Sequence, residues 1–167
     1  MNITIETVDH SQMRPNVDGA DWYFEQEYFC ETCGLAFIEQ GTDVAEHYCS
    51  KMSCDHQKMA HREWLRVKIE PLSDPRYEML LAVHELTEAL MCRHNGVTQE
   101  AVDAFDTEYD KTHSTDCNAG DDPAAPYKIE HTFATAIERI LAGVWKVDWE
   151  TYDKELAATY PGPSHKK

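Results

Sequence analysis

Residues 75–95, PRYEMLLAVHELTEALMCRHN, have the sequence features of one long helix. Asp74 precedes it as a good N-cap, Pro75 suits the first helical position, and Gly96 suits the residue just past a helix end. Together these residues predict one long helix from Pro75 to Asn95. Its middle is apolar on nearly every side, which is typical of a helix buried in a protein core.

A small polar island interrupts this apolar helix. At about 100° per residue, the side chains of the island fall on one continuous arc, with His84 and Glu88 one turn apart and Glu85 and Thr87 between them. The arc meets apolar residues one turn earlier and one turn later, so it does not continue as a solvent-facing stripe. Because buried charges need partners or a metal ion, the island predicts a metal site. The alternative is a small polar window at the domain surface.

The island, HELTE at residues 84–88, is similar to the H-E-x-x-H motif of zincin metallohydrolases, with Glu88 in place of the second histidine. The resemblance implies that His84 and Glu88 bind zinc or another divalent metal. It also implies that Glu85 is the catalytic residue, which activates a metal-bound water. In zincins an edge strand aligns the extended substrate, and the resemblance gives this role to residues 64–70.

A later helix supplies the third metal ligand in zincins, and two neighbouring residues here are candidates for it. Glu130 lies within the apolar arc expected for a helix that begins at Pro126, whereas His131 lies at the margin of that arc. By residue type, His131 is the better zinc donor. The sequence does not decide between them, and both stay candidate ligands.

A cysteine-rich segment predicts a second, structural zinc site. Cys30 and Cys33 form a C-x-x-C pair, and His47, Cys49 and Cys54 follow. Two thiolates at this spacing can bind one tetrahedral ion, and two further donors complete the shell. The segment resembles a zinc finger, which implies His47 as third ligand and Cys54 or Cys49 as fourth. A site of four cysteines fits the spacing equally well, and reduced cysteines without metal are the alternative.

The residues before the long helix predict strands. Residues 2–8 and 64–70 alternate apolar and polar side chains, and the aromatic run at 21–25 suits a further strand. The cysteine-rich segment lies between the last two of these strands in sequence. We therefore expect a small antiparallel sheet that carries an inserted zinc-finger-like module at residues 28–58.

Two further helices are expected after the long one. Thr98 caps the first of them, whose apolar stripe consists of Val102, Phe105 and Tyr109, and Pro126 opens the second. We expect the second of them to pack into the core through Ile129, Phe133, Ile137, Ile140, Leu141 and Val144.

Strands followed by helices predict an α+β fold: a small N-terminal sheet, then three packed helices, similar in outline to a minimal zincin. A chain of 167 residues fits one domain, which we place at residues 1–160, with a disordered tail at 161–167.

The net charge of −16 disfavours nucleic acid as a partner, because phosphate recognition relies on a positive field. We expect a protein or peptide partner instead. The chain has no apolar run long enough to cross a membrane and no secretory signal, which predicts a cytoplasmic location. A compact acidic chain with a small inserted finger also resembles bacteriophage proteins, which would place it in the host cytoplasm.

These features favour a zinc-dependent hydrolase that cleaves a peptide or amide-like substrate with metal-activated water. One alternative is a magnesium-dependent nucleotide pyrophosphohydrolase of the MazG type, which binds magnesium through carboxylates on paired helices. Its carboxylate pattern is similar to the pairs Glu85–Glu88 and Glu100–Asp103, with Asp106 one turn further. The other alternative is a non-enzymatic, acidic zinc-binding interaction protein, for example a viral inhibitor of a host factor.

Overall fold

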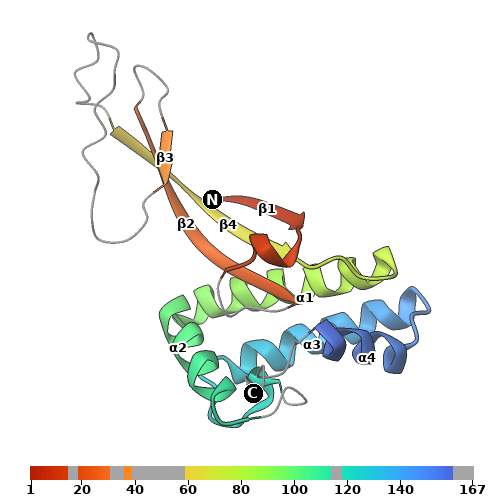
Figure 1. Cartoon of the computed structure of the whole chain (residues 1–167). Coiled ribbons are helices and arrows are strands. Elements are labelled where there is room, and N and C mark those ends of the chain that lie inside the picture. The colour runs from red at the N-terminus through yellow and green to blue at the C-terminus, as the bar shows by residue number, and fades with distance from the viewer. Residues whose placement is uncertain (15–18, 31–35, 39–58, 114–117, 160–167) are drawn as a thin grey trace, which may run out of the picture. The chain divides into compact units, whose positions relative to one another are not determined.

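The structure, a computed structural model, describes residues 1–14, 19–30, 36–38, 59–113 and 118–159. Its strands precede its long helices, so the predicted α+β class is confirmed (Figure 1). The strands are β1 (Asn2–Thr7), β2 (Ala20–Cys30), β3 (Ala36–Ile38) and β4 (Met59–Ile69). The helices are α1 (Pro75–Asn95), α2 (Gln99–Asp110), α3 (Lys128–Val144) and α4 (Trp149–Thr159), with short 3-10 turns η1 (His10–Gln12) and η2 (Ala119–Asp121).

The described strands form one sheet in the order β1-β4-β2-β3. β2 and β3 are antiparallel, with Glu27 opposite Ile38 and Phe29 opposite Ala36. The expectation that residues 64–70 form an edge strand is wrong, because β4 has hydrogen-bonded neighbours on both sides. Its backbone groups are already paired in the sheet, so β4 does not offer a free edge to an extended substrate.

The chain divides into two compact units. One comprises Met1–Thr4 and Tyr23–Arg66, and the other comprises Ile5–Trp22 and Val67–Lys167. Both units draw on the same strands, because the division falls within β1, β2 and β4. In the first unit, Glu25 pairs with Arg66 at 3.0 Å and Glu27 pairs with Arg62 at 2.6 Å.

The expected zinc finger lies outside the described residues. Cys30 is the last residue of β2, but its side chain is not described. The structure describes neither the backbone nor the side chains of Cys33, His47, Cys49 and Cys54. The finger therefore stays a prediction, and so does the disordered tail.

The predicted bounds of the long helix are confirmed in α1. The Asp74 carboxylate accepts a hydrogen bond from the Arg76 backbone N–H at 2.8 Å, and Gly96 ends the helix in the left-handed region at φ 77°. The next helix, α2, also begins as predicted, because the Thr98 hydroxyl accepts a hydrogen bond from the Ala101 N–H.

The orientation of α3 differs from the prediction. The expected core residues Ile129, Phe133, Ile140 and Val144 are 74%, 47%, 62% and 68% exposed, and Ile137 and Leu141 are only partly buried. The buried residues of α3 are instead Glu130, His131, Ala134, Glu138 and Ala142. The prediction failed because apolar residues were assumed to face the core, whereas α3 directs polar side chains toward α1, where they have polar partners.

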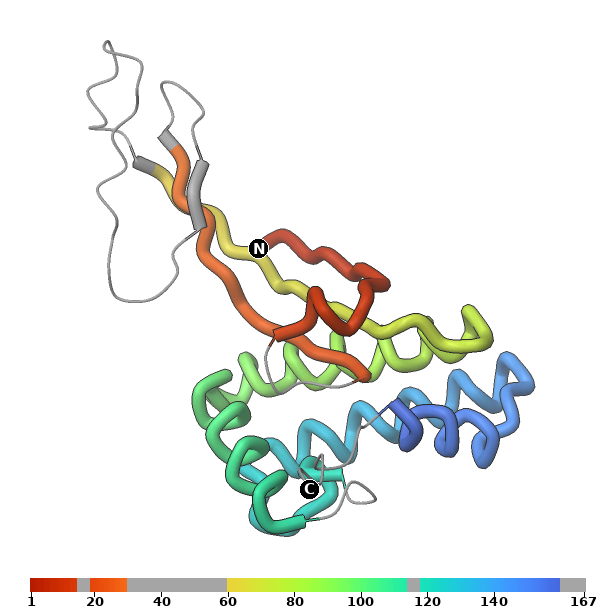
Figure 2. Tube along the Cα trace, viewed as in Figure 1, coloured from red at the N-terminus to blue at the C-terminus, as the bar shows by residue number. Residues whose placement is uncertain are grey.

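The segment after α3 forms a helix that the sequence analysis did not predict. α4 lies back along α3 (Figure 2) and buries Tyr152 completely. Tyr152 joins Tyr77, Leu80 and Ala142 in a small core, against which Trp145 and Trp149 pack. This apolar core closes one end of the α1–α3 pair and fixes the spacing of the two helices.

Candidate metal centre

α1 and α3 pack side by side in opposite directions. Glu88 of α1 contacts His131 of α3, and Asn95, further along α1, contacts Glu130, which precedes His131 in α3. At the other end, His84 contacts Glu138. This antiparallel packing brings polar residues from two distant parts of the sequence into one buried cluster.

Three side chains in this cluster converge on one point. His84 Nε2 lies 3.2 Å from His131 Nδ1 and 3.5 Å from Glu88 Oε2, and His131 Nδ1 lies 2.9 Å from the same Glu88 oxygen. In a tetrahedral zinc site with bonds of 2.0–2.1 Å, neighbouring donor atoms are about 3.3 Å apart. The three donor atoms therefore already have the mutual spacing of metal ligands, and this buried group can hold a metal ion.

A second layer of hydrogen bonds orients two of the three donors. His84 Nδ1 lies 2.9 Å from Glu138 Oε2, and the Tyr152 hydroxyl donates a short hydrogen bond to the other Glu138 oxygen. Trp22 Nε1 donates to Glu88 Oε1 at 3.0 Å, which leaves Oε2 directed at the two histidines. A carboxylate on the far nitrogen of a histidine is the usual support of a metal-binding imidazole, because it fixes the ring and raises its basicity.

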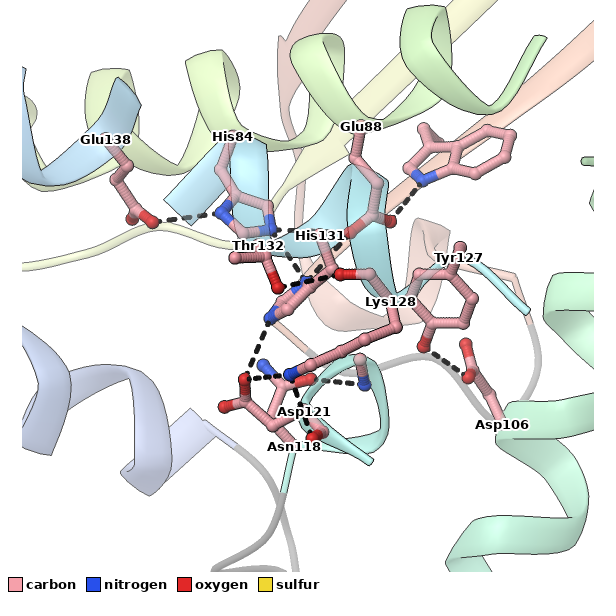
Figure 3. Close-up of polar contacts among 12 residues, drawn as sticks. His84, Glu88, Asp106, Asn118, Asp121, Tyr127, Lys128, His131, Thr132 and Glu138 are labelled. Carbon is pink, nitrogen blue, oxygen red and sulfur yellow. Dashed lines mark hydrogen bonds and ion pairs between the residues drawn. The ribbon is translucent and has the colours of Figure 1, made fainter. Parts of the chain in front are cut away.

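The His131 ring is held by the turn η2 (Figure 3). A Cβ atom built on Gly120 would lie only 2.5 Å from His131 Cγ, so the backbone of this turn is in close contact with the ring. The outer nitrogen, Nε2, faces Asp121 Oδ1 at 4.0 Å. Tyr127 stands edge-on to the ring at 6.3 Å between centroids and donates its hydroxyl hydrogen to Asp106 at 2.5 Å.

The charges of the cluster are mutually dependent. Burial lowers the pKa of His84, but its hydrogen bonds with Glu138 and Glu88 outweigh burial and raise that pKa to about 10. Burial alone would raise the pKa of Glu88, but hydrogen bonds with His131 and His84 hold it well below its ordinary value. Without metal, a protonated His84 thus balances the negative charge of Glu88, and a bound cation would take over this role.

The structure separates the two candidates for the third ligand. His131 lies with His84 and Glu88, whereas Glu130 accepts a hydrogen bond from the Asn95 side chain at 2.6 Å. Both side chains are buried, so burial alone would not have distinguished them. Among the described residues, no cluster of three or more potential ligands other than His84, Glu88 and His131 was found.

Glu85 follows His84 in α1 but is not one of the three converging donors, which are His84, Glu88 and His131. Its side chain is partly exposed, whereas His84, Glu88 and His131 are 7%, 6% and 5% exposed. Burial and then the neighbouring Glu88 carboxylate raise the pKa of Glu85. Glu85 is therefore the most accessible of these four polar residues.

The carboxylates of the MazG-like alternative have other partners or are exposed. Asp103 pairs with Arg14 at 2.9 Å, and the same guanidinium binds Asp21. Asp106 accepts the hydroxyl hydrogen of Tyr127, and Glu100 is exposed. These contacts give the paired-helix arrangement of carboxylates no support.

Sequence reasoning missed the residues that support the donors. Trp22 was expected only as part of a strand, and neither Trp22 nor Tyr152 carries a local signal for a hydrogen bond to Glu88 or Glu138. One signal was present: Glu138 follows His131 by two helical turns, so the two residues lie on one face of a helix. Finding it required knowing that this face, and not the apolar one, is buried.

Comparison of the chain with protein-family models, curated proteins and solved structures gave no match. The geometry of the cluster therefore carries the functional argument. Among the described residues, no helix is both long and apolar enough to span a membrane.

Proposed function

We propose that the chain is a metal-dependent hydrolase whose metal centre is His84, Glu88 and His131, with zinc as the preferred ion. The observation that carries the proposal is the set of three converging donors, without a fourth potential ligand among the described residues. Catalytic zinc sites bind the ion through three protein ligands and leave the fourth position to water, whereas structural sites are closed by four.

The donor set itself favours zinc or a similar transition metal. Two imidazole nitrogens and one carboxylate oxygen are typical zinc ligands, whereas magnesium and calcium prefer oxygen alone. The supports of His84 and Glu88 add to this argument, since outer hydrogen bonds of this kind commonly accompany metal ligands.

The chain's own residues have separate roles in the proposed reaction. A zinc ion held by His84, Glu88 and His131 would supply a water of lowered pKa and would polarise a substrate carbonyl. Glu85, next to His84 and partly exposed, accepts the proton of the attacking water and passes it to the leaving group. Glu138 and Trp22 keep His84 and Glu88 in place while the charge changes.

The substrate we propose is a peptide or another amide, in keeping with the H-E-x-x-E order of His84, Glu85 and Glu88. Because β4 lies between β1 and β2, the substrate does not bind by adding a strand to β4.

The test compares zinc-loaded wild type with Glu85→Gln and with Glu100→Gln, an exposed control on α2. Mixed quenched-fluorescence peptides are the substrate. We expect Glu85→Gln to keep its zinc and to lose at least about 100-fold in the rate of hydrolysis, and the control to match wild type. Wild-type hydrolysis no faster than that of His131→Asn, or unchanged by Glu85→Gln, would sink the proposal.

One observation favours the non-enzymatic alternative. The three donors are only 5–7% exposed, which also suits an ion that joins α1 to α3 without meeting a substrate. In that case zinc would stabilise the chain, every peptide in the panel would stay intact, and Glu85→Gln would behave as wild type. The same set of variants therefore separates the two functions.

A further inference from the structure

One face of α3 is apolar and exposed, which is unusual in so acidic a chain. Its largest members, Ile129, Phe133, Ile140 and Val144, are 47–74% exposed, and the exposed Ala136 lies between them. We call these five residues the α3 stripe. At 100° per residue they span about 80° of the helix, on the side away from the metal ligand His131 and its neighbours.

The charge distribution singles out this face. The chain has 31 acidic residues, but the two acidic residues of α3, Glu130 and Glu138, are both buried toward α1. The exposed side of α3 therefore carries no carboxylate. Its charged residues are Lys128, which pairs with Asp121, and Arg139, which lies over the Trp149 ring at 4.3 Å. Two copies of a chain of net charge −16 repel each other over most of their surfaces, but this face is free of that repulsion.

The α3 stripe is also symmetric along the helix. Ile129 and Val144 lie at equal distances on either side of the midpoint between Ala136 and Ile137, and so do Phe133 and Ile140. When two such helices pack antiparallel about a twofold axis through this midpoint, each large side chain meets a large side chain of the other copy. A self-complementary surface of this kind is what an isologous interface requires.

We propose that two copies of this chain form a symmetric dimer in which their α3 stripes pack against each other in antiparallel orientation. The four large side chains offer roughly 500 Å² of apolar surface, against about 800 Å² that each partner buries in a standard interface. Thr132, Thr135 and Arg139 lie along one side of the α3 stripe and supply polar rim area there. The small, exposed side chain of Ala136 at the centre of the α3 stripe lets the two helices approach closely.

Sedimentation equilibrium of the full-length, zinc-loaded chain tests the proposal. We expect a dimer for wild type and for Met79→Glu, a control on α1 with a similarly exposed apolar side chain (55%, against 47% for Phe133). Phe133→Glu should weaken dimerisation at least about 100-fold, because a twofold axis places each substitution in the interface twice. Since Phe133 is exposed, the variant should keep the wild-type circular dichroism and thermal unfolding.

Charge exchange tests the antiparallel arrangement. Ile140→Lys alone should also give a monomer, whereas Phe133→Glu combined with Ile140→Lys should restore part of the dimer, because position 133 then faces the opposite charge at position 140 of the other copy. Within one chain these positions are two turns apart and do not pair. The proposal would be overturned if wild type stayed monomeric even at a concentration 100-fold above that of the first sedimentation experiment. That result is expected if another part of the chain or a different protein covers the α3 stripe. A dimer that Phe133→Glu leaves intact, or that the double variant does not restore, would overturn the proposal as well.

Discussion

His84 shows how a single residue connects the candidate metal centre to the rest of the fold. One ring nitrogen lies among the donors, and the other lies 2.9 Å from Glu138, which in turn accepts a hydrogen bond from Tyr152 of α4. The orientation of the imidazole therefore depends on residues that would never touch the ion. Loss of such a support typically weakens metal binding about 10- to 100-fold.

Replacing Glu138 by Gln should weaken zinc binding about 10- to 100-fold, because the amide cannot hold the His84 ring with the same charge. Glu130→Gln is the matched control, since both carboxylates are 4% exposed on the same helix but Glu130 binds Asn95. Competition with a fluorescent chelator measures both affinities. An equal loss in the two variants would mean that burial of charge, and not support of His84, is responsible.

The raised pKa of His84 predicts a pH dependence of the metal-free protein. Its folded pKa of about 10 lies above the ordinary value of 6.5, so protonation of His84 stabilises the fold fully below about pH 6.5. This contribution should disappear as the pH rises toward 10. Urea unfolding at pH 6, 8 and 10 should show the difference in stability between wild type and His84→Gln shrinking with pH. A difference that stays constant or grows would contradict the assignment.

At the scale of elements, the position of the candidate metal centre depends on α3 and the turn η2. Gly120 in this turn lies so close to the His131 ring that an added Cβ would have to displace it. We expect Gly120→Ala to lower the free energy of unfolding by about 1–3 kcal/mol and to weaken zinc binding as His131 moves.

Gly143→Ala is the control for this substitution, because it lies in α3 with open space around it. Alanine should raise the free energy of unfolding there by about 0.5–1 kcal/mol through its helix propensity. Thermal unfolding and chelator competition measure both glycine variants. A Gly120→Ala protein with wild-type stability and zinc affinity would show that η2 does not position His131.

The elements also show what could be predicted from the sequence. The bounds of α1 follow from local signals at Asp74, Pro75 and Gly96, and local signals suffice because capping involves neighbouring residues. The pairing of His84 and Glu88 follows from helical spacing alone. The choice of His131 over Glu130 depends on the rotation of α3 about its axis, which is set by tertiary packing. Hydrophobic periodicity gave the opposite rotation, because here the apolar side is the exposed one.

At the scale of the whole molecule, the candidate metal centre draws its residues from two helices that are separated by a long stretch of sequence. An ion at this position should therefore stabilise the entire second unit against unfolding. At free zinc 100-fold above Kd, the gain would be about 2.7 kcal/mol. Urea midpoints with zinc and with excess chelator measure this gain, and His131→Asn should lose it. A gain of equal size in His131→Asn would assign the effect to zinc bound elsewhere, for example in the cysteine-rich segment.

The most direct test of the account is the number of zinc ions bound per chain, measured by mass spectrometry in wild type, His131→Asn and Glu130→Gln. All three proteins are stripped with chelator and reloaded with one metal solution, so that any zinc in the cysteine-rich segment contributes equally. We predict that wild type and Glu130→Gln bind one zinc ion more than His131→Asn does. Equal zinc in all three proteins would contradict a metal centre at His84, Glu88 and His131.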